Sequence, residues 1–463
     1  MSRLSRFAQF FSTTPSSLRA ALLGFGLAFA AVDPSLAGGT SVDCVLGSKQ
    51  QPNRAIAVCS AIIDNPAASR TDRAAALLVQ ADAHARTSDG MTQALAEVDR
   101  AIELDGKNGA AYRMRGDLTR EAGGNLARAE ADFTRAIALN PDDAEAHELR
   151  GVIYTTQHRT DRAIADYDQV IKLQPNNAQA WSDRGVTWYL AGENEKAVRD
   201  ADAALRLDPN RSRTYANRAA AYQKLGKLDK ALADQNEAIR LDPKTPEYFD
   251  NRGLTYADMK EYDKAIADFD QAIRMEARPN FYTNRGDSHQ FKGELGAALS
   301  DYGSALWIDP NFANAYNNRA VLYKKTGERA RALADYEAAL RLDPGNENAA
   351  NGRRTMKAEI AKFGSEAQRP LTAPDPHPSF DCGSARLAVE KAICADPQLG
   401  MLDREIADTY ARLINTKDSR SAGALRRAQR NFIADRNARF GKPGYDLHLA
   451  LQHRLGALED AVR

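Results

Sequence analysis

The sequence has few aromatic side chains, almost no net charge and only one long apolar stretch. Aromatic residues make up 7% of its 463 residues, and the formal net charge is +1. Because nucleic-acid binding usually relies on a strongly basic face, this balance argues against a nucleic-acid-binding protein. A single apolar stretch excludes a membrane protein with several spans. The hydrophobic fraction of 43%, with abundant alanine, favours closely packed helices.

The sequence also lacks the motifs on which common classes of enzyme depend. Its seven histidines are scattered, and none stands in the spacing of a metal-binding pair. No glycine-rich phosphate loop follows a strand-like segment, and the G-x-S-x-G motif is missing. We therefore expect no enzymatic activity, no cofactor and no bound metal.

The apolar stretch lies near the N-terminus and has the form of an export signal. Arg3, Arg6 and Arg19 precede the apolar run Leu22–Val32, and small residues follow up to Ala37. Because the run is too short to span a membrane, it is typical of a cleaved secretory signal peptide rather than of an uncleaved anchor. We expect cleavage near Ala37, which would leave a periplasmic or secreted protein with no integral membrane segment.

Four cysteines form two local pairs that are far apart in the chain. Cys44 is close to Cys59, and Cys382 is close to Cys394. In an oxidising compartment this arrangement predicts one disulfide within each pair, each worth about 2–4 kcal/mol. The alternative is a metal site, but zinc ligands usually stand closer together and include histidine.

The middle of the chain repeats itself with a period of about 34 residues. A unit that begins at residue 144 has Gly151 at position 8, Tyr154 at position 11, Ala163 at position 20 and Pro175 at position 32. Such a period is that of stacked helical hairpins. At position 7 an arginine recurs in every clear unit, at Arg115, Arg150, Arg184, Arg218, Arg252, Arg285 and Arg319.

These marks resemble those of the tetratricopeptide repeat (TPR). The resemblance implies an all-α fold, a right-handed superhelix of stacked hairpins whose groove takes a protein or an extended peptide. The segments we expect are a signal peptide at 1–37, degenerate repeats at 38–108, seven repeats at 109–345, a capping helix at 346–363, a proline-rich linker at 364–380 and a small helical domain at 381–463.

Two charged columns run through the repeats in register. Position 7 is arginine, where leucine is more usual in this family, and position 23 is aspartate in every clear unit. Opposite charges in register suggest an Arg–Asp ladder between helices, which would specify packing more than it adds stability. The ladder pairs are Arg150 with Asp166, Arg184 with Asp200, Arg218 with Asp234, and Arg252 with Asp268.

A third column, at position 6, is rich in asparagine. A side-chain amide offers both donors and an acceptor, so such a column can bond to the backbone of an extended peptide. It resembles the asparagine ladder in the repeats of O-linked N-acetylglucosamine transferase. The alternative is that these side chains cap helices or cross-link adjacent repeats. The candidate groove residues are Asp183, Asn217, Asn251, Asn284 and Asn318.

The last 83 residues have a different pattern. Phe380-Asp381-Cys382, Glu390 to Cys394 and Leu402-Asp403 resemble the motifs of the LprI-type lysozyme inhibitor family, which implies that lysozyme is a partner. The second half departs from that family, because Phe432 replaces a tryptophan and Arg439 replaces a third cysteine. Asp446 lies near the usual place of the fourth cysteine.

Two further patterns accompany these motifs. Apolar residues between Leu399 and Leu413 lie on one helical face and predict a core. The stretch from Arg420 to Arg439 holds six arginines, which either form a solvated helix face or include one that pairs with carboxylates of a partner.

The sequence thus predicts an exported, non-enzymatic TPR adaptor of the cell envelope, whose C-terminal domain inhibits lysozyme. The alternative is an envelope scaffold whose C-terminal domain has lost inhibition and only docks a partner.

Overall fold

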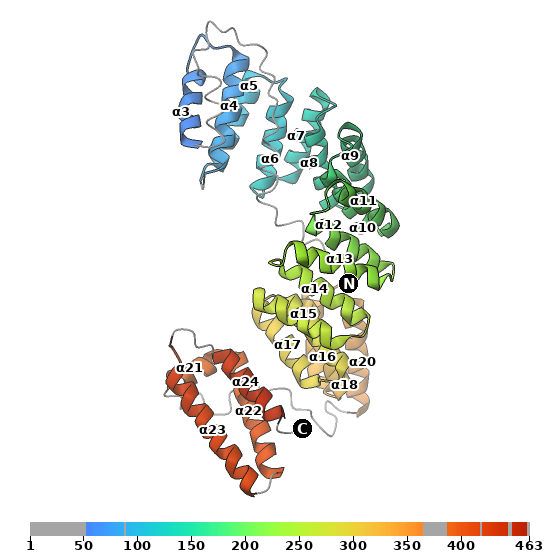
Figure 1. Ribbon diagram of the computed structural model, residues 1–463, viewed down its shortest axis with the longest axis vertical. Coiled ribbons are helices and arrows are strands. Elements are labelled where there is room, and N and C mark those ends of the chain that lie inside the picture. Colours follow the sequence, from blue (N-terminus) through green and yellow to red (C-terminus); the bar gives the residue numbers. More distant parts are fainter. Residues whose placement is uncertain (1–51, 88, 364–386, 417–418, 443–446, 461–463) are drawn as a thin grey trace. The chain divides into compact units, whose positions relative to one another are not determined.

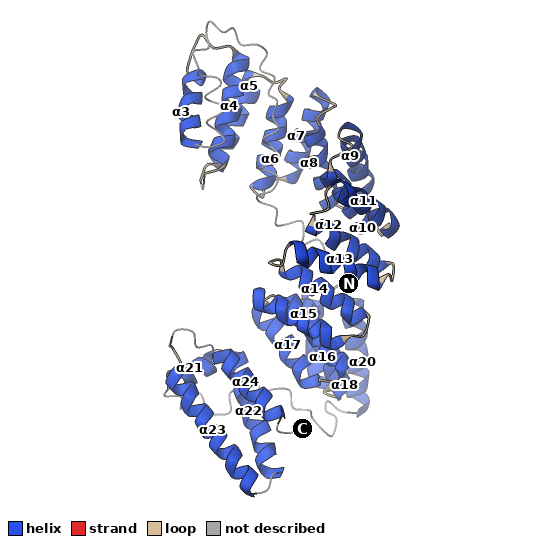
Figure 2. Ribbon diagram, viewed as in Figure 1, coloured by secondary structure: helices blue, strands red, loops and turns tan. Residues whose placement is uncertain are grey.

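The computed structural model describes residues 52–460, except residue 88 and the segments 364–386, 417–418 and 443–446. The described residues form 22 helices and no strand (Figure 2). The expected signal peptide, the linker, Cys44, Cys382 and Asp446 lie outside the described residues. None of the described helices is long and apolar enough to cross a membrane.

Seven helical hairpins follow one another along the repeat region (Figure 1). Each consists of a first helix and a second helix that pack against each other. They are α6 (Gly109–Glu121) with α7 (Leu126–Leu139), α8 (Ala144–Thr156) with α9 (Thr160–Leu173), α10 (Ala178–Leu190) with α11 (Asn194–Leu207), α12 (Ser212–Lys224) with α13 (Leu228–Leu241), α14 (Pro246–Asp258) with α15 (Tyr262–Met275), α16 (Pro279–Lys292) with α17 (Leu295–Ile308), and α18 (Ala313–Thr326) with α19 (Arg329–Leu342).

Further helices flank the repeats. Helix α3 (Pro52–Ile63) packs on α4 (Arg70–Ala85), which forms a hairpin with α5 (Met91–Leu104). Helix α20 (Glu347–Phe363) packs on α19. The chain divides into two compact units, with the boundary between Leu241 and Asp242. Within each unit, the second helix of one hairpin contacts the first helix of the next.

The turn between the two helices of a hairpin needs one residue whose backbone adopts the left-handed conformation, with positive φ. Gly192, Gly226, Gly293 and Gly327 take this place with φ between 70° and 86°. In hairpins without this glycine, His158 and Lys260 adopt φ of 57° and 64° in its place. The turn geometry is therefore kept even where the residue type is not favourable.

Close approach of the two helices depends on the small residue at position 8. At Gly253 an added Cβ would lie 2.7 Å from Cε1 of Phe269, and at Gly151 it would lie 3.0 Å from the ring of Tyr167. The aromatic ring at position 24 thus fills the space that the absent side chain leaves.

We predict that Gly253→Val lowers the free energy of unfolding by about 1–3 kcal/mol, because it overpacks a filled interface. Thermal melting followed by circular dichroism measures this loss. Gly423→Val is the control, since a Cβ there would meet only a guanidinium nitrogen of Arg427 at 3.9 Å. Equal melting of the two variants would contradict the packing argument.

The C-terminal domain contains α21 (Ala388–Ala395), α22 (Pro397–Thr416), α23 (Ser419–Arg439) and α24 (Leu447–Asp460). The predicted apolar face of α22 is confirmed, because Leu399, Leu402, Ile406 and Leu413 are buried in one core with Tyr410 packed against it. Residues of the other three helices complete that core.

Candidate functional site

The arginine and aspartate columns meet within each hairpin. Nε of Arg218 donates to Oδ2 of Asp234 at 2.8 Å, and Nη2 donates to Oδ1 at 2.7 Å. All seven arginines at position 7 make this two-point contact, with distances of 2.5–3.0 Å. Two parallel bonds from a planar guanidinium fix the orientation of both helices. The seven aspartates are all buried.

A further set of acids, which the sequence reasoning missed, joins neighbouring hairpins. The remaining guanidinium nitrogen, Nη1, reaches back to the second helix of the preceding hairpin. Arg184 contacts Asp168 at 2.5 Å and Arg218 contacts Asp202 at 2.6 Å in this way. Arg115 contacts Asp99, and Arg285 contacts Asp270, in the same manner. The sequence pattern could have predicted these contacts, because the acids also recur at about the repeat period.

An aromatic ring three residues before the arginine in the sequence packs against its guanidinium group. The guanidinium carbon of Arg184 lies 4.7 Å from the ring centroid of Trp181, and that of Arg218 lies 5.4 Å from Tyr215. Burial lowers the pKa of Arg218, but the bonds to Asp234 and Asp202 outweigh it, so the net shift is upward. The guanidinium therefore stays charged, and Arg218 holds three helices together.

We predict that Asp234→Ala lowers the free energy of unfolding by about 3 kcal/mol, because it leaves the half-buried Arg218 without its main partner. Asp202→Ala removes the more exposed partner of the same arginine and should cost only about 0–1 kcal/mol. Chemical denaturation of both variants measures the difference. If Asp234→Ala did not change the stability, the ladder would have no structural role.

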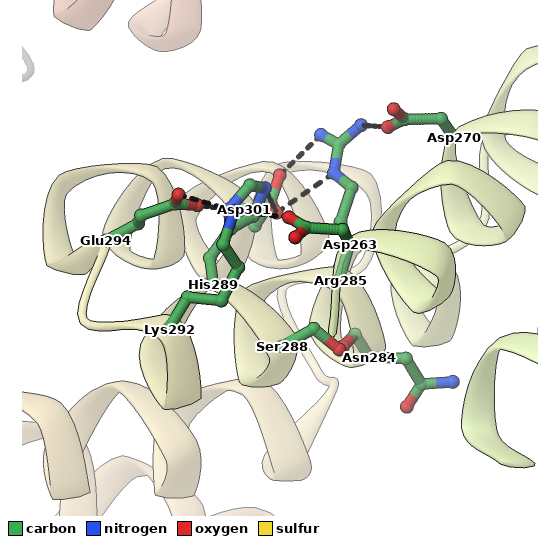
Figure 3. Close-up of polar contacts among 9 residues, drawn as sticks. All are labelled: Asp263, Asp270, Asn284, Arg285, Ser288, His289, Lys292, Glu294 and Asp301. Carbon is green, nitrogen blue, oxygen red and sulfur yellow. Dashed lines mark hydrogen bonds and ion pairs between the residues drawn. The ribbon is translucent and has the colours of Figure 1, made fainter. Parts of the chain in front are cut away.

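The asparagine column does not form one continuous binding surface. Asn284 is only 2% exposed, and its amide donates to Oδ1 of Asp250 in the preceding repeat at 2.7 Å. The amide of Asn318 donates to Oδ1 of Asp287 at 2.8 Å. The side chain of Asn284 is buried between two repeats and cross-links them, which favours the alternative that this residue joins adjacent repeats. In Figure 3 its amide points away from the charged cluster of its own hairpin.

The remaining members of the column are half-buried. Asp183 accepts a bond from Nε2 of Gln179 at 2.7 Å, and Asn217 and Asn251 keep part of their surface accessible. Their role in peptide binding stays a prediction.

A charged cluster joins the hairpin of α16 and α17 to α15 of the preceding hairpin (Figure 3). Nδ1 of His289 lies 2.6 Å from Oε2 of Glu294, and Nζ of Lys292 contacts both Glu294 and Asp263 at 2.7 and 2.6 Å. Burial raises the pKa of Glu294, but the bonds from Lys292 and His289 outweigh it, so the net shift is downward. Within the described parts of the chain, no group of three His, Cys, Asp or Glu side chains is arranged to hold a metal ion.

The C-terminal domain contains a buried ion pair that joins two of its helices. Nη1 of Arg436 on α23 lies 3.4 Å from Oδ1 of Asp403 on α22, and both residues are buried. Phe432 packs against the core, where a tryptophan is usual. The side chain of Arg439, which replaces a cysteine, is 58% exposed and lies 3.4 Å from Asp435.

The structure describes only one cysteine of each predicted pair. Neither Cys59 nor Cys394 carries a free thiol in the described structure. Their expected partners, Cys44 and Cys382, lie outside the described residues, so the predicted pairing stays a prediction.

Comparison with family models identifies both parts of the chain. Models described as tetratricopeptide repeat match residues 118–168, 156–212, 212–245, 246–278 and 313–346, and a TPR repeat model matches 291–327. The model described as lysozyme inhibitor LprI matches residues 382–454. A search of curated protein sequences found no match.

Solved structures with a similar arrangement share little sequence with this chain. The Cut9–Hcn1 assembly is 16% identical with a TM-score of 0.45, over 68% of this chain and 62% of that chain. Yeast Tom70 is 16% identical with a TM-score of 0.46, over 78% of this chain and 79% of its own. A tetratricopeptide repeat protein from Parabacteroides merdae is 18% identical with a TM-score of 0.44. The match covers 61% of this chain and 98% of that protein's chain. The chain thus spans less than two thirds of the Cut9–Hcn1 chain.

The repeat period, the hairpins and the family models agree. The chain is a tetratricopeptide-repeat protein with a C-terminal domain of the lysozyme inhibitor LprI type.

Proposed function

We propose that the protein is an exported, non-enzymatic adaptor of the cell envelope, whose repeats bind a protein or an extended peptide and whose C-terminal domain inhibits lysozyme. The observation that carries this proposal is the combination, in one chain, of TPR hairpins with a match to lysozyme inhibitor LprI. Repeat stacks of this kind present extended surfaces to partners. An inhibitor of a secreted enzyme acts where that enzyme acts, which fits an export signal.

The packing of the C-terminal domain supports an intact inhibitor fold. Its core includes Phe432 in place of the usual tryptophan, and Asp403 and Arg436 join two of its helices inside that core. Such a buried pair specifies one arrangement of the helices. The domain therefore retains a defined surface for a partner.

A second candidate function is docking without inhibition. The observation that favours it is the exposed Arg439, since a cysteine at this place would anchor the end of α23 in the family pattern. On this alternative the domain binds another envelope protein and does not occupy the lysozyme cleft.

The experiment that separates the two compares the full oxidised chain with a chain that ends after residue 363. The truncated chain retains α20 over the last hairpin, so its repeats should remain folded. We predict that the full chain slows lysozyme clearing of a bacterial cell-wall suspension at a one-to-one ratio, whereas the truncated chain does not. If the folded full chain leaves several types of lysozyme unaffected, the docking function is favoured.

Export is tested separately. We predict that the mature protein isolated from the periplasm begins at Gly38, as N-terminal sequencing would report. A protein that retains Arg3 and Arg6 and stays in the membrane fraction would contradict cleavage.

A further inference from the structure

One arginine of the C-terminal domain has no acidic partner among the described residues. Arg454 lies on α24 and is half-buried. Its Nε donates to Oε1 of Gln429 on α23 at 2.9 Å, and its guanidinium carbon lies 5.7 Å from the ring centroid of Phe432 on the same helix. The guanidinium is therefore held by an amide and a ring, and no described carboxylate balances its charge.

The two terminal nitrogens of this guanidinium have no acceptor in the part of the chain that the structure describes. Nη2 of Arg454 is shielded from solvent and makes no hydrogen bond. Nη1 makes none either, but it is not closed off from solvent. The side chain as a whole keeps part of its surface accessible. A ligand can therefore reach Nη1 without entering the core of the domain.

Other arginines of the chain that are withdrawn from solvent do have acids beside them. Arg436, in the same domain, is buried and lies 3.4 Å from Asp403. Burial lowers the pKa of Arg218, but the acids that it binds outweigh this effect. Burial also lowers the pKa of Arg454, where only the nearby Tyr410 acts in the opposite direction. The cost of withdrawing this cation from water is therefore not offset inside the domain.

The sequence around this arginine adds further positive charge. Arg426 and Arg430 are exposed on α23, three residues before and one residue after Gln429. His453 directly precedes Arg454 on α24 and is exposed as well. Because residues three apart on a helix share a face, Arg426 lies on the face of α23 that carries Gln429. This part of the domain therefore attracts an anion and repels a cation.

The basic stretch from Arg420 to Arg439 was the expected source of an arginine that binds a carboxylate. Arg436 is buried in its pair with Asp403, and Arg439 also contacts an acid. An arginine that is already paired, or that is fully solvated, gains little from a further carboxylate. Arg454 is half-buried without a counterion, so it gains more than these residues do.

We propose that Arg454 is the residue with which the C-terminal domain binds a carboxylate of its partner enzyme. A guanidinium presents Nη1 and Nη2 side by side, so the two oxygens of one carboxylate can contact both. Lysozyme cleaves its substrate with two carboxyl groups, and either of them has this chemistry. The carboxylate would supply the charge that Arg454 lacks. This inference rests on the proposed inhibition of lysozyme and names the residue that makes the contact.

The same geometry has a consequence for stability that does not depend on lysozyme. A cation that is half-buried without a counterion does not stabilise a fold, so an uncharged side chain of similar length should be tolerated in its place. Arg454→Met keeps an unbranched apolar side chain that can pack on Phe432. We expect the full chain with this substitution to melt at no lower temperature than the wild type.

The test measures binding of the full oxidised chain to lysozyme by titration calorimetry. We expect Arg454→Met to weaken binding at least about tenfold, because a charge-assisted hydrogen-bonded contact is lost. Arg427→Met is the matched control, since it removes an exposed arginine from α23. The control should weaken binding by less than about fivefold, because contacts of solvated charges contribute little.

A second arm of the test identifies the source of the carboxylate. Two lysozyme variants, each with one catalytic carboxyl group changed to an amide, are titrated with the wild-type chain and with Arg454→Met. One of the two should bind the wild-type chain about tenfold more weakly but should bind Arg454→Met as well as unmodified lysozyme does. Soluble cell-wall peptides, which also carry carboxylates, serve as the other probe, and we expect them not to bind.

Equal binding of lysozyme by the wild type and by Arg454→Met would overturn the proposal but leave inhibition in place. If the wild-type chain binds no lysozyme, both the contact and the proposed inhibition fail. Equal losses in Arg454→Met and Arg427→Met would show a general attraction between charges and no specific site. Additive effects in the lysozyme variants, or binding of cell-wall peptides through Arg454, would overturn the assignment to an enzyme carboxylate. A lower melting temperature of Arg454→Met would show that the arginine is a structural residue.

Discussion

The two-point contact between an arginine and an aspartate is the interaction on which the repeats depend. A hairpin of two short helices cannot bury enough surface to be stable alone, so it must be held in a fixed orientation against its neighbours. Arg218 does this with one side chain, because it binds Asp234 in its own hairpin and Asp202 in the preceding one. The planar guanidinium allows all these contacts at once, which a lysine could not provide.

Much of this could be predicted from the sequence, since a 34-residue period shows which residues share a face. The columns of Arg218 and Asp234 were visible in this way. The role of Asn284 could not be predicted in this way, because position 6 lies where adjacent repeats meet. Whether the asparagine faces solvent depends on the acceptor in the preceding repeat, which is Asp250.

The central claim is that the contact between Arg218 and Asp234 holds the two helices of a hairpin in a fixed orientation. A double-mutant cycle on this pair tests it, with opening free energies taken from hydrogen exchange of the helix amides. The account predicts a favourable coupling of about 2–3 kcal/mol between the two side chains. A coupling near zero would contradict it.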